Sequence, residues 1–408
     1  MLSSSRARAA RVDRRARAAV AALFLANGAL FANLLPRYPE IKAALGLENA
    51  VYGLAVAAFP LGAIVAGLAA AALMRRFGSA RLAVAGTVLT AVGVFVASVA
   101  PSLLVFAAAL FCAGAMDSIT DVAQNAHGLR VQRRYGRSII NSFHAVWSIG
   151  AVLGGSMAAG AIALHVPLGV HLGISGLLFS VVSLVALRFC LPGRDVDITP
   201  DSASAGAADA AAPSARTSAV GPRTVFILVA LVVIAIGGTL VEDAGNSWAT
   251  LYLSGLGAPA ALAATGYIAL VGAQFIGRLA GDGLVDRFGQ RAVARTGGVI
   301  AAVGMGLALA FPTVPGTIAG FAAAGFGVAT LVPAAMHEAD ELPGLRHGTG
   351  LTIVSWLMRL GFLLSPPFVG LIADATSLRV GLLVVPVAGV LVILLAGVLQ
   401  KRSARLEA

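Results

Sequence analysis

Acidic and polar residues recur at helical spacing inside an apolar stretch near position 120. Asp117, Asp121 and Asn125 follow one another at four-residue intervals in AALFCAGAMDSITDVAQNAHG. Residues four apart share one face of an α-helix, and a charged side chain near the centre of a bilayer costs about 3 kcal/mol or more. Such residues mark ion or substrate pathways. We therefore predict that Asp117 and Asp121 handle protons and that Asn125 contacts a substrate.

A second apolar stretch, NSFHAVWSIGAVLGG, follows an arginine-rich loop and carries His144 and Trp147. If the two stretches cross the membrane in opposite directions, His144 and Asp121 should lie at similar depth. A desolvated carboxylate favours its neutral form and histidine titrates near neutrality, so the pair could take up and release a proton. The alternative is a permanent hydrogen bond between Asp121 and His144 that only holds two helices together.

Polar residues in the second half of the chain complete the predicted site. Glu242 and Asp243 are neighbours in EDAGNSWATLYL. Neighbours on a helix point about 100° apart, so only one of the two acids can face the cavity squarely. We predict that Glu242 faces it and takes part in proton coupling. The alternative is that both acids lie at the membrane interface and are hydrated. Arg359 stands alone in a late apolar stretch and needs a partner, for which the candidates are Glu242, Asp243, Asp117 or an anionic group on the substrate. The predicted substrate-binding residues are Asn27, Asn33, Asn125, Trp147, Asn246, Trp356 and Arg359.

The composition identifies the elements that position these residues. Hydrophobic residues make up 59% of the 408 residues and charged residues 12%, against about 25% charged residues in a soluble protein. Apolar segments of about 20 residues match helices crossing a hydrocarbon core of about 30 Å. We predict an all-α membrane protein with twelve spans, at about 18–38, 50–73, 82–100, 103–126, 139–163, 169–190, 224–250, 259–280, 292–311, 315–337, 348–373 and 378–400.

The chain divides into two halves around a polar linker. Residues 191–222 are rich in Ala, Ser, Pro and Asp, and such a segment cannot bury enough apolar surface to fold. We predict a basic tail (1–17), a six-helix bundle (18–190), a disordered linker (191–222), a second six-helix bundle (223–400) and a short tail (401–408).

The positive charge indicates orientation in a membrane. The net charge is +11, and the arginines gather at alternate boundaries of the predicted spans. By the positive-inside rule, both termini and the linker are cytoplasmic, and the pattern argues against nucleic-acid binding. No metal-ligand pattern, cofactor motif or catalytic motif is recognised in the sequence, so we do not expect an enzyme. We expect a monomer in the cytoplasmic membrane. Its expected partners are lipid, protons and a small-molecule substrate.

The two halves are related by an internal repeat. An offset of 211 positions, the difference between Gly78 and Gly289, also aligns Gly114 with Gly325 and several other small residues. The acidic residues do not repeat. A duplicated scaffold with an asymmetric polar interior suits a carrier whose two bundles rock about a site between them.

Twelve spans in two parallel repeats and the loop Asp286–Arg291 (DRFGQR) resemble the major facilitator superfamily. The segments 121–125 (DVAQN), 141–150 (NSFHAVWSIG) and 278–282 (RLAGD) are similar to a branch of uncharacterised bacterial permeases near the fucose permeases. The family's signature loop normally carries an Asp, which the first-half loop at 75–78 (RRFG) lacks, so the latch that the resemblance implies would be one-sided. The residues that the resemblance assigns to conformational gating are Arg76, Gly78, Arg278, Asp282, Asp286, Arg287 and Gly289.

The resemblance implies secondary active transport by alternating access. The surplus of deep acids over deep basic residues favours proton-coupled symport of a small polar solute, such as a sugar or a related metabolite. The fourth span lacks the arginine, and the fifth span the Gly-Pro motif, that are typical of many drug/proton antiporters, which disfavours that class. Two alternatives stay open: a proton-driven exporter of a metabolite or amphipathic cation, and a non-transporting receptor on the same fold.

Overall fold

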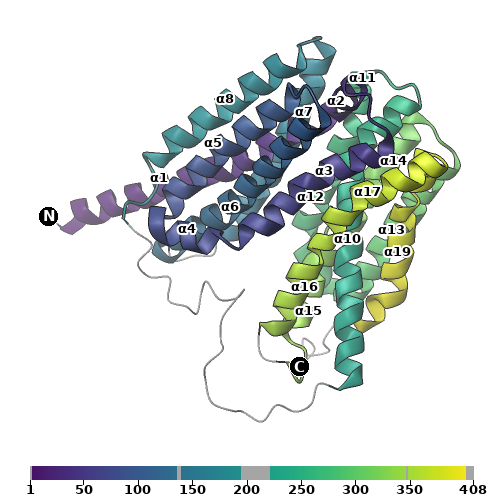
Figure 1. Cartoon of the computed structure of the whole chain (residues 1–408). Helices are drawn as coiled ribbons and strands as arrows, with labels where there is room; N and C mark the ends of the chain where they lie inside the picture. The colour runs from purple at the N-terminus through teal and green to yellow at the C-terminus, as the bar shows by residue number, and fades with distance from the viewer. Residues whose placement is uncertain (1, 136–138, 194–220, 346–347, 401–408) are drawn as a thin grey trace. The chain divides into compact units, whose positions relative to one another are not determined.

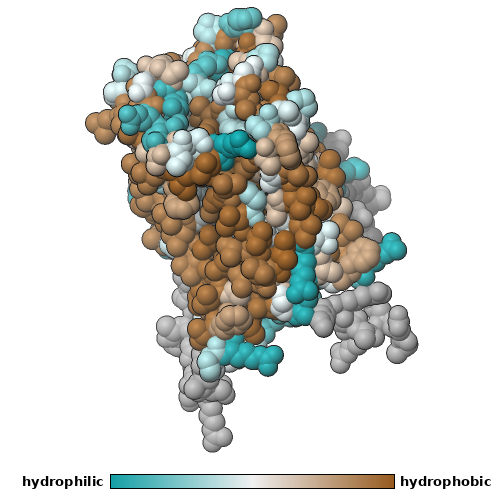
Figure 2. Space-filling model, turned by 90° about the vertical axis from the view of Figure 1, so that its right-hand side faces the viewer, coloured by the Kyte–Doolittle hydropathy of each residue, from teal (hydrophilic) through white to brown (hydrophobic). Residues whose placement is uncertain are grey.

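The computed structural model describes residues 2–135, 139–193, 221–345 and 348–400, and every regular element within these ranges is helical. Twelve helical segments there are long and apolar enough to cross a membrane, which confirms the predicted fold class. Apolar side chains cover much of the face shown in Figure 2, as expected for helices surrounded by lipid. Most of the predicted linker and the whole of the predicted tail 401–408 lie outside the described residues.

The helices form two compact units (Figure 1), which we describe separately. In the first unit α1 packs along α7, α8 and α6, while α5 packs between α6 and α8. The unit consists of α1 (Leu2–Ala32), η1 (Leu35–Arg37), α2 (Tyr38–Ala44), most of α3 (Asn49–Gly67), α4 (Ala70–Phe77), α5 (Ser79–Ser98), α6 (Leu103–Tyr135), α7 (Ile140–Ala163), α8 (Leu168–Leu187) and the short α11 (Ala260–Ala263).

In the second unit α10 packs along α17, α19 and α15, and α13 packs along α14 and α19. This unit consists of the first turn of α3 together with α10 (Pro222–Gly255), nearly all of α12 (Thr265–Phe288), α13 (Gln290–Ala310), α14 (Val314–Val328), α15 (Leu331–Asp340), α16 (Thr349–Leu357), α17 (Arg359–Ala375), α18 (Leu378–Gly381), α19 (Val384–Leu395) and η2 (Ala396–Val398).

Several helices extend beyond the apolar stretches that predicted them. Helix α1 begins at Leu2 instead of near residue 18, so most of the predicted tail 1–17 is helical, and α6 continues to Tyr135 instead of ending near 126. The segment added to α1 is rich in Ala and Arg, and the one added to α6 contains three Arg and a Gln, all residues with high helix propensity. Hydropathy locates only the lipid-embedded part of such a helix, and the helix itself continues past it.

The internal repeat is visible in the backbone. Gly78 precedes α5 with φ 81° and ψ 150°, and Gly289 precedes α13 with φ 81° and ψ 154°. A positive φ is accessible to glycine at little cost. In both loops the arginine two positions earlier lies over the intervening phenylalanine ring, 5.3 Å from its centroid. The offset of 211 positions between Gly78 and Gly289 therefore relates equivalent structural elements in the two halves.

Glycine also brings α1 and α7 into close contact in the first unit. A β-carbon on Gly28 would collide with the carbonyl of Trp147, and one on Gly150 would collide with the carbonyl of Leu25. The equivalent contact in the second unit places Gly361 of α17 against the carbonyl of Ile236 on α10. Small residues at such crossings let helix backbones approach closely, and this approach positions the polar side chains nearby.

Candidate transport site

The predicted acidic stripe of the first unit lies in a connected group of polar side chains, which we call the Asp117 cluster. Helix α6 contributes residues on one stripe, and α1 and α7, held together by their glycine contacts, contribute the others. The Asp117 cluster consists of Asn27 from α1, Asp117, Asp121, Gln124 and Asn125 from α6, and His144 and Trp147 from α7.

Asn27 is the centre of the cluster. Its side-chain amide donates to Oδ1 of Asp117 at 2.7 Å, while its own Oδ1 accepts from Nε1 of Trp147 at 2.8 Å. The Gln124 amide is also 3.4 Å from Oδ1 of Asn27, a longer and weaker contact. One buried amide therefore joins α1, α6 and α7 and fixes the position of the Asp117 carboxylate.

Asp121 and His144 are linked through Asn125. The Asn125 amide donates to Oδ1 of Asp121 at 3.0 Å, and its Oδ1 lies 3.0 Å from Nε2 of His144. Since that oxygen can only accept, this network assigns a proton to Nε2 of His144. The edge of the His144 ring also contacts Phe24, with the centroids 5.3 Å apart. The sequence placed Asp121 and His144 at the same level, and the structure adds the bridging amide.

Exposure changes along the Asp117 cluster. Asn27 and Gln124 are buried, Asp117 is partly buried, and Asp121 and His144 are exposed on the surface of the first unit. The acceptor oxygen Oε1 of Gln124 is buried and makes no hydrogen bond within the described part of the chain. The cluster thus has an open end that carries a carboxylate and an imidazole, and a closed end that keeps one acceptor unused.

A second polar group lies in the second unit around Glu242 of α10. Gln274 of α12 donates from its amide to Oε2 of Glu242 at 2.7 Å, and Arg278, one turn further along α12, is 3.6 Å from the same oxygen. The resemblance assigned Arg278 to gating together with Asp282, but its described ion pair is with Glu242. Asp243 is buried at 7% exposure, with the hydroxyl of Ser247 at 3.4 to 3.5 Å, so the alternative of a hydrated Asp243 is wrong.

Arg359 opens α17 just after a break between α16 and α17. At this break the hydroxyl of Thr239 donates to the carbonyl of Met358 at 2.9 Å. Arg359 is partly buried, and among the described residues it makes no ion pair. Neither Glu242 nor Asp243 pairs with it. In the same unit Oδ1 of Asn246 is a buried acceptor without a hydrogen-bond partner in the described ranges, and Trp356 is 43% exposed.

Asn33 lies apart from the Asp117 cluster. It is fully buried, donates to the carbonyl of Ala29 at 2.8 Å, and its Oδ1 is 2.9 Å from Nε2 of His171. His171 lies beside Arg37, which forms an ion pair with Glu40 at 2.6 Å. The predicted grouping of Asn33 with Asn27 is therefore not observed, and Asn33 belongs to a buried structural network.

Two glutamines of these groups were missed by the sequence analysis. Gln124 lies three residues after Asp121 and seven after Asp117, so it shares their helical stripe, and this spacing was an available signal. Gln274 is four residues before Arg278 on α12, but its contact with Glu242 depends on how α10 and α12 pack. The remaining gating candidates lie at helix ends: Arg76 and Gly78 at the junction of α4 and α5, and Asp282, Asp286, Arg287 and Gly289 at the end of α12.

A family model for the Major Facilitator Superfamily matches residues 20–282 and 273–407. The chain belongs to the major facilitator superfamily. An uncharacterised transporter of Sinorhizobium fredii, y4wD, is 30% identical over 383 residues, which cover 94% of this chain and 97% of the relative. The chain is thus a membrane transporter of this superfamily, and its relatives are transporters rather than enzymes.

Solved structures share the fold at low sequence identity. The D-xylose-proton symporter aligns with 94% of this chain and 96% of its own, with a TM-score of 0.70 and 16% identity. The nucleoside transporter NupG aligns with 95% of this chain and 98% of its own, with a TM-score of 0.70 and 13% identity. At these identities the similarities show the fold alone, and the substrate is argued from the residues.

Proposed function

We propose that this transporter is a proton-coupled symporter of a small polar solute, a sugar or related metabolite, with both termini in the cytoplasm. The observation that carries the proposal is the Asp117 cluster, in which two carboxylates one helical turn apart are surrounded by amide side chains and reach an imidazole. The similarity in fold to a D-xylose-proton symporter and to the nucleoside transporter NupG supports a polar, hydroxylated solute.

The open end of the cluster should meet water. Asp121 and His144 are exposed on the first unit, and both lie on candidate membrane spans. Exposure of a carboxylate to hydrocarbon is costly, so such residues face a water-filled cavity or a protein interior. An aqueous surface at Asp121 would give protons a route to the cluster.

The cluster has the chemistry for holding one proton between two carboxyl groups. Asp117 and Asp121 are one turn apart, and two nearby like charges disfavour simultaneous ionisation. The amide of Asn27 stabilises the charged form of Asp117 by donating to it. When a proton is bound, the carboxyl becomes a donor. Oε1 of Gln124 belongs to the same cluster and makes no hydrogen bond among the described residues, and we propose that it accepts from the protonated carboxyl.

In the second unit, the solute would use polar groups that make no hydrogen bond or ion pair among the described residues. These are the guanidinium of Arg359 and Oδ1 of Asn246, with Trp356 as a stacking face. In the first unit, Asn125 and Trp147 remain proposed solute contacts, and both already bond within the Asp117 cluster. A hydroxylated solute can accept from Arg359 and donate to Asn246. Because Arg278 already neutralises Glu242, Glu242 is assigned a supporting part in proton coupling, and the protonation step is assigned to Asp117 and Asp121.

The helix-end residues Arg76, Gly78, Asp282, Asp286, Arg287 and Gly289 are proposed to control conformational change. Proteoliposomes containing an internal pH-sensitive dye test the function when pooled sugars, nucleosides and related metabolites are added outside. Symport predicts internal acidification that depends on the solute. Internal alkalinisation on adding solute would support an exporter working by antiport, and no proton movement with a transported solute would refute coupling.

A further inference from the structure

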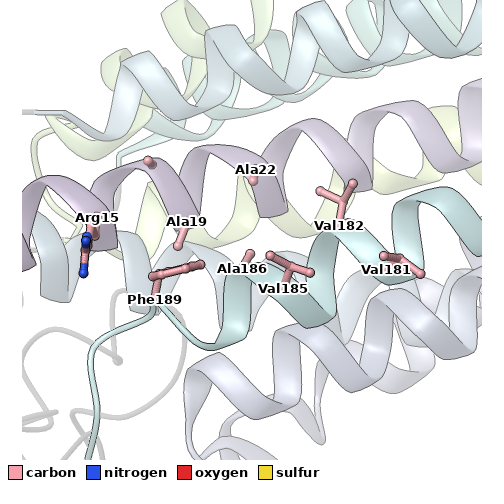
Figure 3. A pocket seen from close by; sticks show the side chains of 9 residues that line it. Arg15, Ala19, Ala22, Val181, Val182, Val185, Ala186 and Phe189 are labelled. Atoms are coloured by element: carbon pink, nitrogen blue, oxygen red, sulfur yellow. The ribbon is translucent and has the colours of Figure 1, made fainter.

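A groove on the first unit lies between the middle of α1 and the end of α8 (Figure 3). Its volume is about 570 Å³. The floor is formed by alanine side chains of α1, including Ala18 and Ala22, and by valine side chains of α8, including Val181 and Val185. Arg15 and Phe189 lie together at one end of the groove. It is separate from the Asp117 cluster and shares no residue with it.

The charge of Arg15 is uncompensated. Its guanidinium lies 6.0 Å from the centroid of the Phe189 ring, and no carboxylate pairs with it among the described residues. Two nearby basic residues are engaged elsewhere, since Arg17 contacts Tyr135 and Arg134 pairs with an aspartate of α1 at 3.0 Å. Arg14 and Arg188 are exposed and do not line the groove. Arg15 therefore presents an available positive charge at the end of an apolar groove.

The groove includes residues of the candidate membrane span Leu168–Leu187 and also Phe189 beyond its end, so we expect it to cross the boundary between water and hydrocarbon. Helix α8 ends at Leu187, and Phe189 lies two residues beyond it, a position at which aromatic residues mark the membrane interface. Val181 lies eight positions earlier, so at about 1.5 Å per residue the groove extends about 12 Å along α8. A ligand that fits must carry an anionic group at the interface and an apolar chain reaching into the membrane.

We propose that this groove is a binding site for an anionic phospholipid, with the phosphodiester against Arg15 and one acyl chain along the alanine and valine floor. Basic pockets between membrane helices are suited to lipid headgroups, and alanine side chains leave room for a chain that larger residues would exclude. A second copy of the chain is disfavoured as the occupant, because a packed helix would bury Arg15 without a counter-charge.

The test is native mass spectrometry of the full-length transporter, released from detergent and titrated with phosphatidylglycerol or phosphatidylcholine of identical acyl chains. We expect tighter binding of phosphatidylglycerol. Arg15→Gln should weaken it about fivefold, because one basic residue near an anionic headgroup contributes about 1 kcal/mol. Arg14→Gln, an exposed neighbour outside the groove, is the matched control and should change it little. Ala22→Phe should fill the groove and weaken both lipids.

Four results would overturn the proposal. Equal binding of the two lipids, or an Arg15→Gln variant that behaves like Arg14→Gln, would show that Arg15 does not recognise a headgroup. Displacement of phosphatidylglycerol by inorganic phosphate alone would indicate a site for free phosphate. A dimer that forms in place of lipid adducts and is lost in Ala22→Phe would make the groove an interface between copies of the chain. Melting temperatures of all variants identify any loss of folding.

Discussion

The hydrogen bond from Trp147 to Asn27 can be measured by a double-mutant cycle. Trp147→Phe removes the Nε1 donor while keeping an aromatic side chain, and Asn27→Ala removes the acceptor that lies 2.8 Å away. Asn27→Ala also removes the 2.7 Å bond to Asp117. The two single variants therefore share one interaction, and the cycle isolates that interaction from the other losses.

The expected coupling follows from the geometry. Asn27 is 6% exposed, and its bond to Trp147 has a distance typical of a well-formed hydrogen bond. Hydrogen bonds between membrane helices contribute about 0.6 kcal/mol on average and up to about 1.7 kcal/mol. We expect a coupling energy of about 0.6–1.5 kcal/mol. Asn27→Ala alone, which also loses the bond to Asp117, should lower the free energy of unfolding by about 1–3 kcal/mol.

The free energies of unfolding of the wild type, the two single variants and the double variant are measured by reversible unfolding in mixed micelles. Far-ultraviolet circular dichroism follows the unfolding, because this signal does not depend on the tryptophan that is replaced. The control cycle combines Asn27→Ala with Ser156→Ala. Ser156 is exposed, bonds to the carbonyl of Val152 in its own helix and lies nine positions beyond Trp147, about 13 Å along α7. These two changes should be additive. A Trp147–Asn27 coupling no larger than the control value would refute the assignment of Asn27 as the centre of the Asp117 cluster.

Three further predictions concern other parts of the chain. Arg278→Gln should reduce transport at least tenfold by leaving Glu242 without its ion pair, and the double variant with Glu242→Gln should recover part of the loss; a double variant worse than Arg278→Gln would contradict this. Gly114→Val and Gly325→Val should each lower the melting temperature, because the added side chains collide with equivalent backbone carbonyls in the two halves; tolerance at both sites would argue against close packing there. Burial raises the pKa of the Cys190 thiol to about 11, so in a Cys112→Ala background its reaction with maleimide should be slow at pH 7 and should increase about tenfold per pH unit up to that value; a rate already constant from pH 7 to 9 would exclude the raised pKa.

The acidic stripe of α6 could be predicted from the sequence because it depends only on the spacing of residues within one helix. Asp117, Asp121 and Asn125 are spaced by one helical turn, and this spacing survives any arrangement of the bundle. The choice of Asn27 as their partner is not local. It depends on the contact of Gly28 and Gly150 with backbone carbonyls of the opposite helix, which no single stretch of sequence reveals.

The separation of Asn33 from Asn27 could have been predicted. Six residues correspond to about 600° of helical rotation, so if the predicted span 18–38 is one helix, the two side chains lie about 120° apart around it. Two asparagines with that spacing do not share a face, and the structure accordingly places Asn33 beside His171. Residue type alone suggested that Asn27 and Asn33 line the same cavity, whereas their spacing on a helix predicts that they belong to two separate hydrogen-bond networks.

The second half was less predictable because its pairings lie between helices distant in sequence. Glu242 lies on α10, and its partners Gln274 and Arg278 lie on α12. The sequence left Glu242, Asp243 and Asp117 open as partners of Arg359, and the structure pairs Glu242 with Arg278 instead. The helix breaks that place Arg359 at the start of α17 follow from tertiary packing near Thr239 and have no strong signal in the apolar sequence around them.

The most direct test of the proposed symport compares proton-driven accumulation with solute exchange in the same proteoliposomes, for wild type, Asp117→Asn and Asp121→Asn. An asparagine keeps an oxygen that can accept from Asn27, but its amide group cannot take up a proton as a carboxylate does. The wild type should accumulate its solute when a pH gradient is imposed. We predict that at least one variant loses this accumulation and retains exchange without a gradient, and accumulation that is unchanged in both variants would contradict the role of the Asp117 cluster in proton coupling.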